Sequence, residues 1–326
     1  ENGDAPTELF IDGEDLTPVT MSLGSLSVTG ADVSFLQAIE ENMGDEDAMG
    51  QAVFSKLYEN PINPPYDGFS MKDFAVEVAG AAFAMPEMTG TIERNSDGEP
   101  VKFVTKPFTM SLSADPEGGE AGASLAGALS MVGYEKVELK GEGVSNYDPK
   151  TDIISFSADD NFLEIVDGAK FSYGGKIGGY NAYSKAIGES MNFDDMSEGA
   201  EPDPAAIQEA AGLLIFHNMK IAIKDESLVD RIFNVVATQQ GQDPEQMRNQ
   251  AVMMMGMAPM MAQQVGADMN LVTELSSAVS AFIAKPGTLT IAIEPKEPLA
   301  VSTLMEVSDP SQITKEMLGF SATHKE

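Results

Sequence analysis

The sequence predicts an α+β protein built on a large, twisted and mostly antiparallel β-sheet, with amphipathic helices packed on one face. Three observations lead to this prediction: alternating apolar runs, Asp-Gly pairs between them, and segments in which a strand pattern passes into a helix pattern. Strict alternation buries one face of a strand and leaves the other polar, as in antiparallel sheets. With 326 residues, 43% of them hydrophobic, the chain is long enough to bury a sizeable core.

Two Asp-Gly pairs predict hairpins in this sheet. Asp97-Gly98 and Asp167-Gly168 each lie between alternating apolar runs. Such a pair tolerates positive φ at both turn positions and matches the twist of the flanking strands, which makes it the strongest short-range hairpin signal. We therefore expect antiparallel pairing on both sides of each pair. Asp12-Gly13 and Asp67-Gly68 are weaker candidates because the runs beside them are less regular.

Helices are expected where alternation gives way to apolar residues at helical spacing. Strand-to-helix order is predicted for 21–39, 169–187 and 213–233, and helix-to-strand order for 125–140 and 270–295. In the segment 213–233, Asp225 is a suitable N-cap for a helix. Its apolar stripe is formed by Leu228, Ile232 and, just beyond the segment, Val235. The last of the five segments should bury a second stripe, formed by Leu271, Leu275, Val279 and Phe282.

Acidic stretches indicate how the chain is divided. Residues 40–50, 115–122 and 193–204 are predicted loops, and the last contains two prolines. We expect a β-rich lobe over residues 1–200 and an α+β lobe with a methionine-rich helix over residues 201–326. The two lobes are expected to pack as one continuous body.

The charge balance limits the partners. The chain has 52 acidic and 19 basic residues, a formal net charge of −33, and only three of the bases are arginines. Affinity for nucleic acid depends on neutralising phosphates with Lys and Arg, so no nucleic-acid partner is expected. Such a charge keeps a protein soluble in salty surroundings. An acidic surface that binds cations is the alternative interpretation.

Cysteine usage and the amino terminus favour a periplasmic or secreted protein. The absence of cysteine excludes disulfides, thiolate catalysis and thiolate metal sites, and it fits an oxidising compartment, although a cytoplasmic origin stays open. The sequence starts at Glu1 in a polar segment, which we interpret as the product of removing a signal peptide or anchor; a trimmed chain would look the same. No apolar run approaches the ~20 residues that span a bilayer.

The segment 243–269 is the most unusual part of the sequence. Asp243-Pro244 predicts an N-cap followed by proline at the first helical position, and eight methionines follow. Gly256 and Pro259 are expected to bend or interrupt this helix. Methionine is flexible and lines surfaces that accommodate variable apolar shapes. The candidate ligand-binding residues are therefore Met253, Met254, Met257, Met260 and Met261, with Phe282 from the next helix.

These methionines have three interpretations. They could form a pliable wall or lid for a lipid or another apolar ligand. They could equally fill an ordinary helix in the core. Copper binding by thioethers is the third interpretation, but it requires ligands that converge from several directions.

No catalytic constellation is found. The chain has two histidines, His217 and His324, and the first alternates with apolar residues, which indicates a core or edge histidine. A P-loop, a dinucleotide fingerprint, an EF-hand loop and a zinc-protease motif are all absent. We therefore expect neither an enzyme nor a cofactor, and no metal site is assigned. Calcium at the acidic stretches 148–152 or 194–203 stays open.

In its general pattern the chain resembles periplasmic lipid-handling proteins of Gram-negative bacteria, including AsmA-like proteins, which build a curved antiparallel sheet around or against helices. The features that carry the resemblance are the meander from Val101 to Ile177, the strand-to-helix joins, and the closing helix-strand unit from Phe282 to Val301. The resemblance covers most of the chain and implies no particular ligand residue.

Such a shape predicts non-catalytic binding of a lipid or other apolar ligand in a groove or cavity between sheet and helices, in the cell envelope. The competing interpretation is a structural or protein-interaction module whose interior is fully packed, with an envelope protein as its partner. An enzyme comes third.

Overall fold

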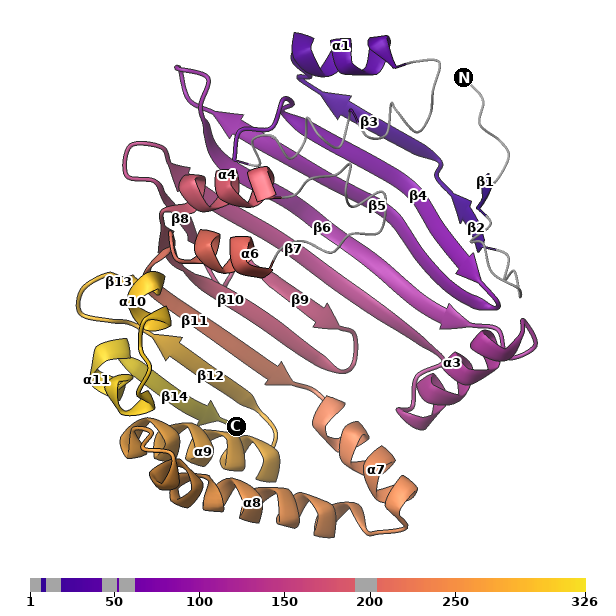
Figure 1. Cartoon of the computed structure of the whole chain (residues 1–326). Helices are drawn as coiled ribbons and strands as arrows, with labels where there is room; N and C mark the ends of the chain where they lie inside the picture. Colours follow the sequence, from indigo (N-terminus) through magenta and orange to yellow (C-terminus); the bar gives the residue numbers. More distant parts are fainter. Residues whose placement is uncertain (1–6, 10–18, 43–51, 53–61, 191–203) are drawn as a thin grey trace.

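The computed structural model describes residues 7–9, 19–42, 52, 62–190 and 204–326. Their strands form one 14-stranded sheet in which all neighbours are antiparallel, and this confirms the predicted fold class (Figure 1). In sheet order the strands are β1 (Thr7–Leu9), β2 (Val19–Ser22), β4 (Gly68–Val78), β5 (Ala81–Arg94), β6 (Pro100–Ala114), β7 (Lys136–Asp148), β8 (Ile153–Phe156), β10 (Ala169–Gly178), β11 (Ile215–Asp225), β12 (Thr288–Ile293) and β14 (Phe320–Lys325). Off this path, β3 (Ser25–Thr29) pairs with β4, β9 (Phe162–Ile165) with both β7 and β10, and β13 (Leu299–Ala300) with β11.

The helices lie at the ends and edges of the sheet or over one of its faces (Figure 1). They are α1 (Val33–Glu41), α3 (Glu120–Met131), α4 (Tyr180–Ser190), α6 (Pro204–Ala211), α7 (Leu228–Gln240), α8 (Pro244–Gln264), α9 (Met269–Ala284), α10 (Val301–Met305) and α11 (Lys315–Leu318), with a 3₁₀ turn at Pro310–Gln312. In the view of Figure 1, α3 lies at one end of β6, α4 and α6 lie near β8, and α7, α8 and α9 lie beyond β14. Among the described helices, none covers the middle of β5 and β6 in this view.

Both predicted hairpins are confirmed, but their turns differ from the expected geometry. Asp97-Gly98 joins β5 to β6 and Asp167-Gly168 joins β9 to β10, with antiparallel pairing on both sides. Only one residue of each pair has positive φ: Gly98 at 83° and Asp167 at 56°. At the first turn the side-chain oxygen of Asn95 accepts from the backbone N–H groups of Asp97 and Glu99, so an Asx-type turn replaces the expected two-residue turn.

The weaker Asp-Gly candidates form no hairpin among the described residues. Gly68 is the first residue of β4, which follows a bend at Asp67. Asp12-Gly13 lies outside the described part of the chain.

All five predicted joins between strands and helices are present. The chain runs from β3 into α1, from β10 into α4 and from β11 into α7, and it runs from α3 into β7 and from α9 into β12. Asp225 accepts from the N–H of Val229 at 2.9 Å, as a capping carboxylate should, although Ser227 occupies the N-cap position itself. The helix starts two residues later than a simple N-cap at Asp225 would place it.

The sheet has one apolar and one polar face, because residues directly opposite each other on paired strands point to the same side. Phe171, Ile223 and Leu289 lie opposite one another on β10, β11 and β12. One residue along each strand, Lys170, Lys224 and Thr288 form the corresponding row on the other side. We call these the apolar face and the polar face.

Helices α9 and α4 pack on the apolar face of the sheet, in two separate cores. The larger core joins α9 to β12 and β14, and the predicted stripe of α9 packs there, as expected. The smaller core is centred on Tyr147 and Ile154, which Tyr180 of α4 contacts. Between the two cores the apolar face of β9 and β10 is less covered, and this region forms the candidate site described below.

Helix α9 also supplies a hydrogen-bond acceptor for a backbone N–H group of the terminal strand β14. The N–H of Ala322 donates to Glu274 Oε1 at 2.9 Å, and the other carboxylate oxygen of Glu274 pairs with Lys315. These two partners, the lysine first, hold the pKa of Glu274 below its ordinary value. A strand at the end of a sheet presents unpaired backbone groups, and α9 covers one of them here.

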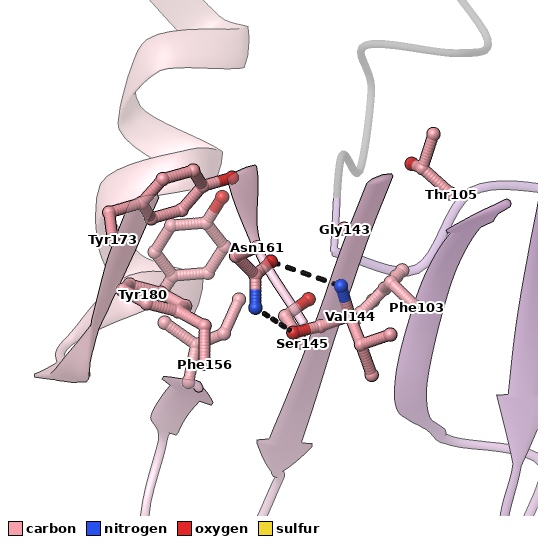
Figure 2. Close-up of a pocket in the computed structure, with 10 residues that line it drawn as sticks. Phe103, Thr105, Gly143, Val144, Ser145, Phe156, Asn161, Tyr173 and Tyr180 are labelled. Carbon is pink, nitrogen blue, oxygen red and sulfur yellow. Dashed lines mark hydrogen bonds between the residues drawn. The ribbon is translucent and has the colours of Figure 1, made fainter. Parts of the chain in front are cut away.

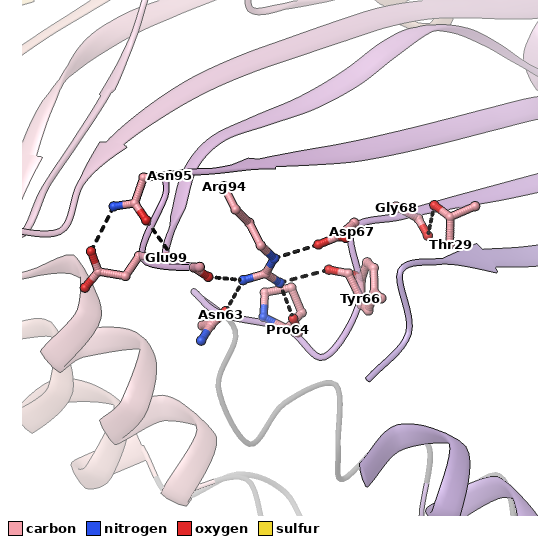
Figure 3. Close-up of polar contacts among 10 residues, drawn as sticks. Thr29, Asn63, Pro64, Tyr66, Asp67, Gly68, Arg94, Asn95 and Glu99 are labelled. Atoms are coloured by element: carbon pink, nitrogen blue, oxygen red, sulfur yellow. Dashed lines mark hydrogen bonds and ion pairs between the residues drawn. The ribbon is translucent and has the colours of Figure 1, made fainter. Parts of the chain in front are cut away.

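At the opposite end of the sheet, Arg94 anchors the chain segment that leads into β4 (Figure 3). Its Nε donates to Asp67 Oδ1 at 2.6 Å, and its terminal nitrogens donate to the side chain of Asn63 and to the carbonyls of Pro64, Tyr66 and Gly98. A planar guanidinium supplies five donors in a fixed fork, and this site uses all of them. Arg94 therefore ties residues 63–67 to the β5–β6 hairpin.

The sheet continues across the predicted boundary between the lobes. Strand β10 precedes that boundary and β11 follows it, and the two pair from Ala169–Asp225 to Gly178–Ile215. The acidic stretch that suggested the boundary lies outside the described residues, except for Pro204, the first residue of α6.

Candidate functional site

The five candidate methionines do not face the interior. Helix α8 contacts α9 and α7 rather than the sheet, and its one buried residue is Ala262. Met253, Met254, Met257, Met260 and Met261 are 48–69% exposed, so they do not form the wall of an internal cavity, and a lid at the surface stays a prediction. Because α8 is a second layer outside α9, only its inner side can be buried. The side with these methionines faces outward.

The remaining candidate, Phe282, lies in a different environment. It is 8% exposed and belongs to the core between α9 and the sheet. Its ring lies edge-on to His324, with ring centroids 6.2 Å apart. The structure therefore does not bring Phe282 together with the exposed methionines. Helix α8 also runs without interruption through Gly256 and Pro259, so of the predicted bend or interruption the interruption does not occur.

A break in one strand creates the candidate site. Strands β8 and β9 occupy the same position between β7 and β10, and five residues, 157–161, separate them. Over the same gap β7 and β10 have two residues each: 143 and 144 in β7, and 173 and 174 in β10. The extra residues leave the sheet and return through Asn161.

The side chain of Asn161 replaces the missing ladder bonds. It is 3% exposed, accepts from the N–H of Val144 at 3.0 Å, and donates to the carbonyls of Val144 at 2.8 Å and Ser157 at 2.7 Å (Figure 2). The backbone carbonyl of Asn161 accepts from the N–H of Tyr173 at 3.1 Å. An amide side chain can both donate and accept, so a single residue satisfies this gap.

Next to this break is a pocket of about 240 Å³. Aromatic side chains dominate its lining: Phe103, Phe156, Tyr173 and Tyr180, with Ile154, Thr105 and Asn161 completing it together with residues 143–145 of β7. Figure 2 shows the tyrosines and Phe156 grouped on one side of Asn161, with Phe103 and Thr105 on the other. Phe156 and Tyr173 are in edge-on contact, with ring centroids 5.8 Å apart.

The pocket lies on the apolar face of the sheet. Phe103, Ser145, Phe156 and Gly175 lie directly opposite one another in turn, and Gly175 continues this row to Met219 of β11. Met219 is on the same face as the core residues of β11 because side chains alternate along a strand. The aromatic lining and the two cores therefore share one side of the sheet.

Exposed apolar surface continues from the pocket along β9 and β10. Leu163 and Phe171 form a cross-strand pair on the apolar face and are 41% and 38% exposed. The Phe171 ring centroid is 6.0 Å from that of Tyr173, which lines the pocket. An apolar ligand in the pocket would thus extend over these side chains.

The polar groups at the pocket favour binding rather than acid-base chemistry. Burial raises the pKa of the Tyr180 phenol, and the neighbouring Tyr183 adds to the effect, so Tyr180 stays protonated at neutral pH. At the adjacent core, Tyr147 donates to Asp152 at 3.1 Å, and its pKa is raised by burial and then by this carboxylate. Among the described residues that line the pocket, none carries a carboxylate, imidazole or amine. It offers hydroxyl and amide groups among aromatic rings.

A second, more open cleft of about 550 Å³ lies where α7, α8 and the end of α9 meet. Its lining is polar and includes two cations, Arg248 and Lys285. Arg248 binds the Ile283 carbonyl and Asp230, and it lies 5.0 Å from the ring centroid of Phe233, while Lys285 pairs with Glu326. Both of these cations already have partners, so this cleft is not the candidate site.

Within the described ranges, no three His, Asp or Glu side chains are grouped so that they could hold a metal ion. Over the same part of the chain, every helix is too short or too polar to cross a membrane.

Sequence reasoning missed the aromatic pocket. Tyr173 and Tyr180 lie in the segment 169–187, for which the sequence predicts only a strand followed by a helix. The available signal was the polar run 157–161 inside the strand-like region 153–165, which ends in an amide residue. Nothing in the sequence states that this run leaves and re-enters one strand position.

Comparison with known proteins gives one result. No curated protein matches the sequence. A family model described as "Uncharacterized protein" matches residues 162–325, which run from the first residue of β9 to the last of β14. The match includes Tyr173 and Tyr180 but not Phe103 or Asn161. Since it covers half of the 326 residues, the chain belongs to this family of uncharacterized proteins.

Proposed function

We propose that the protein is a non-catalytic, periplasmic or secreted binding protein for a lipid or another apolar ligand, as the resemblance to AsmA-like lipid-handling proteins implies. The ligand would occupy the aromatic pocket and extend over the apolar face between the two cores. The single observation that carries this proposal is the continuity between the pocket and the exposed pair Leu163–Phe171.

Two properties of the site support an apolar ligand. Small-molecule sites are concave, mostly apolar, and carry a few fixed polar groups, as this pocket does. Its volume is slightly below the ~300–1,000 Å³ typical of whole ligand sites, so it would hold one part of a longer molecule. Exposed Leu and Phe in the middle of a sheet face also mark a surface that another molecule covers.

The test is a titration with cis-parinaric acid, a fluorescent fatty acid whose emission rises in apolar surroundings. Gly143→Val should fill the pocket, because a Cβ at this position meets its nearest neighbour, Asn161 Oδ1, at an ordinary 3.4 Å. Ser155→Val is the matched control, since Ser155 lies opposite Lys176 on the polar face of the same region. We expect Gly143→Val to weaken binding roughly tenfold, and Ser155→Val to leave it unchanged.

Two results would contradict the proposal. The wild-type protein could fail to bind the fatty acid, or both valine variants could behave alike. A third variant, Met253→Gln/Met257→Gln, shows whether the ligand instead sits on α8. If only this variant loses binding, the ligand site is the methionine surface and not the pocket.

The alternative is a protein-interaction module without a small ligand. It is favoured by the outward-facing methionines of α8, since an exposed apolar stripe is a common feature of interaction surfaces. The same titration separates the two proposals, because such a module would not bind the fatty acid in the pocket.

A further inference from the structure

The polar face of strands β10, β11, β12 and β14 carries a concentration of positive charge. The register places Lys170 opposite Lys224, Lys224 opposite Thr288 and Thr288 opposite Lys325. By alternation along the strands, Lys176 and Lys220 lie on the same face. We call these five residues the lysine face.

No acidic residue shares this face within the four strands. Its other positions are Ser, Thr, Ala, Gly and Asn, with Ile215 opposite Gly178 at one end of the face. The absence is notable because acidic residues outnumber basic ones by 52 to 19 in the chain. A surface of this kind contrasts in sign with the net charge of the whole molecule.

The lysine face is covered at Gly174, where a Cβ would lie 2.7 Å from the backbone nitrogen of Ala158, but most of its lysines are exposed and incompletely neutralised. Lys176, Lys220, Lys224 and Lys325 are exposed, and the sheet-contacting cores lie on the opposite side. Lys224 pairs with Glu226 at 2.8 Å. Across the described ranges, no ion pair is found for Lys176, Lys220 or Lys325.

One contact within the face is unfavourable in the isolated molecule. Lys170 and Lys224 are direct cross-strand neighbours, and like charges in this position destabilise a sheet. Glu164 lies opposite Lys170 on the other side, and Lys170 also lies 3.5 Å above the ring centroid of Phe162. At Lys224 acidic neighbours already offset this repulsion, because Glu226 and then Glu164 raise the pKa of its ammonium group.

We propose that the lysine face is the docking surface for an acidic segment of a partner protein. Charge complementarity carries the proposal. Surfaces that bind nucleic acid combine basic side chains with aromatic rings on which bases stack. Beside the lysine face, the ring of Phe162 is already covered by Lys170, and the three arginines of the chain lie elsewhere, so nucleic acid is a less favoured partner. A bilayer is a less favoured partner for the lysine face. This point rests on the proposed function, because the ligand pocket opens on the opposite face of the sheet and would point away from the membrane.

The probe for this surface is a fluorescently labelled peptide of ten glutamates, whose binding to the full chain is followed by anisotropy at 50 and 200 mM salt. The test variant is Lys176→Glu/Lys220→Glu. The control is Lys106→Glu/Lys150→Glu, which changes the net charge equally at exposed positions outside these four strands. Lys176→Gln/Lys220→Gln separates the loss of positive charge from added repulsion.

We expect the test variant to lose binding about tenfold or more at 50 mM salt, the glutamine variant to lose less, and the control to stay within about twofold of the wild type. Far-UV circular dichroism confirms that each variant is folded, and fatty-acid binding in the pocket should be unchanged in all of them. This readout separates failure of the lysine face from failure of the proposed ligand site.

The proposal is overturned if the wild type does not bind the peptide, or if the test and control variants lose binding equally. It is also overturned if vesicles containing phosphatidylserine, or a single-stranded oligonucleotide, bind through the same lysines more tightly than the peptide does.

Discussion

Replacing Asn161 with leucine should destabilise the protein strongly, although the two side chains are similar in size. The change removes three hydrogen bonds with the backbone of Val144 and Ser157. Each buried backbone group left without a partner costs roughly 1–3 kcal/mol. Val144 is only half buried and water can satisfy part of this loss, so we expect about 3 kcal/mol in total.

The assay is urea unfolding followed by far-UV circular dichroism. Asn146→Leu is the matched control, because Asn146 lies on the same strand as Val144 but is exposed. Surface substitutions usually stay within about 0.5 kcal/mol, and this control should do so. If Asn161→Leu loses less than about 1 kcal/mol, or no more than Asn146→Leu, then the side chain does not hold the broken strand in place.

Three further outcomes are expected. Phe282→Ala should lower the free energy of unfolding in urea by about 3–5 kcal/mol, because it leaves a cavity in the core between α9 and the sheet. Ile232→Ala should lower it far less, since Ile232 is 47% exposed. Equal losses of stability in the two variants would place Phe282 outside the core. Because the pKa of Glu274 is lowered in the folded protein, its carboxylate stabilises the fold fully above the ordinary pKa of 4.5, and this stabilisation is lost as the pH falls through the folded pKa. Glu274→Gln should therefore flatten the decline of the urea midpoint below about pH 4.5. An unchanged decline would contradict this role of Glu274. Peroxide should oxidise the five exposed methionines of α8, detected by mass spectrometry, with little change in the urea midpoint, and a large drop would show that they are packed.

Much of the fold was predictable because it depends on short-range patterns. Alternation identified the strands around Asp97-Gly98 and Asp167-Gly168, and helical spacing identified the buried stripe of α9. Both patterns report which side of an element is apolar. They do not report what lies against that side.

This limit explains the error over the methionines. The sequence shows that α8 is rich in methionine, but its burial depends on whether α8 contacts the sheet or another helix. The aromatic pocket was missed for a related reason. It requires Phe103, Phe156 and Tyr180, from β6, β8 and α4, to meet at a break that only the strand register defines.

The excursion at 157–161 also constrains how the chain can assemble. A regular strand can slide by two residues against its neighbours and keep its apolar side inward. Strands β8 and β9 cannot do so together, because a slide would move Asn161 away from Val144 on β7 and from Tyr173 on β10. Residues 157–161 therefore fix the register between β7, the β8–β9 strand position and β10. A sheet with these strands paired in another register would lose all of these hydrogen bonds at once.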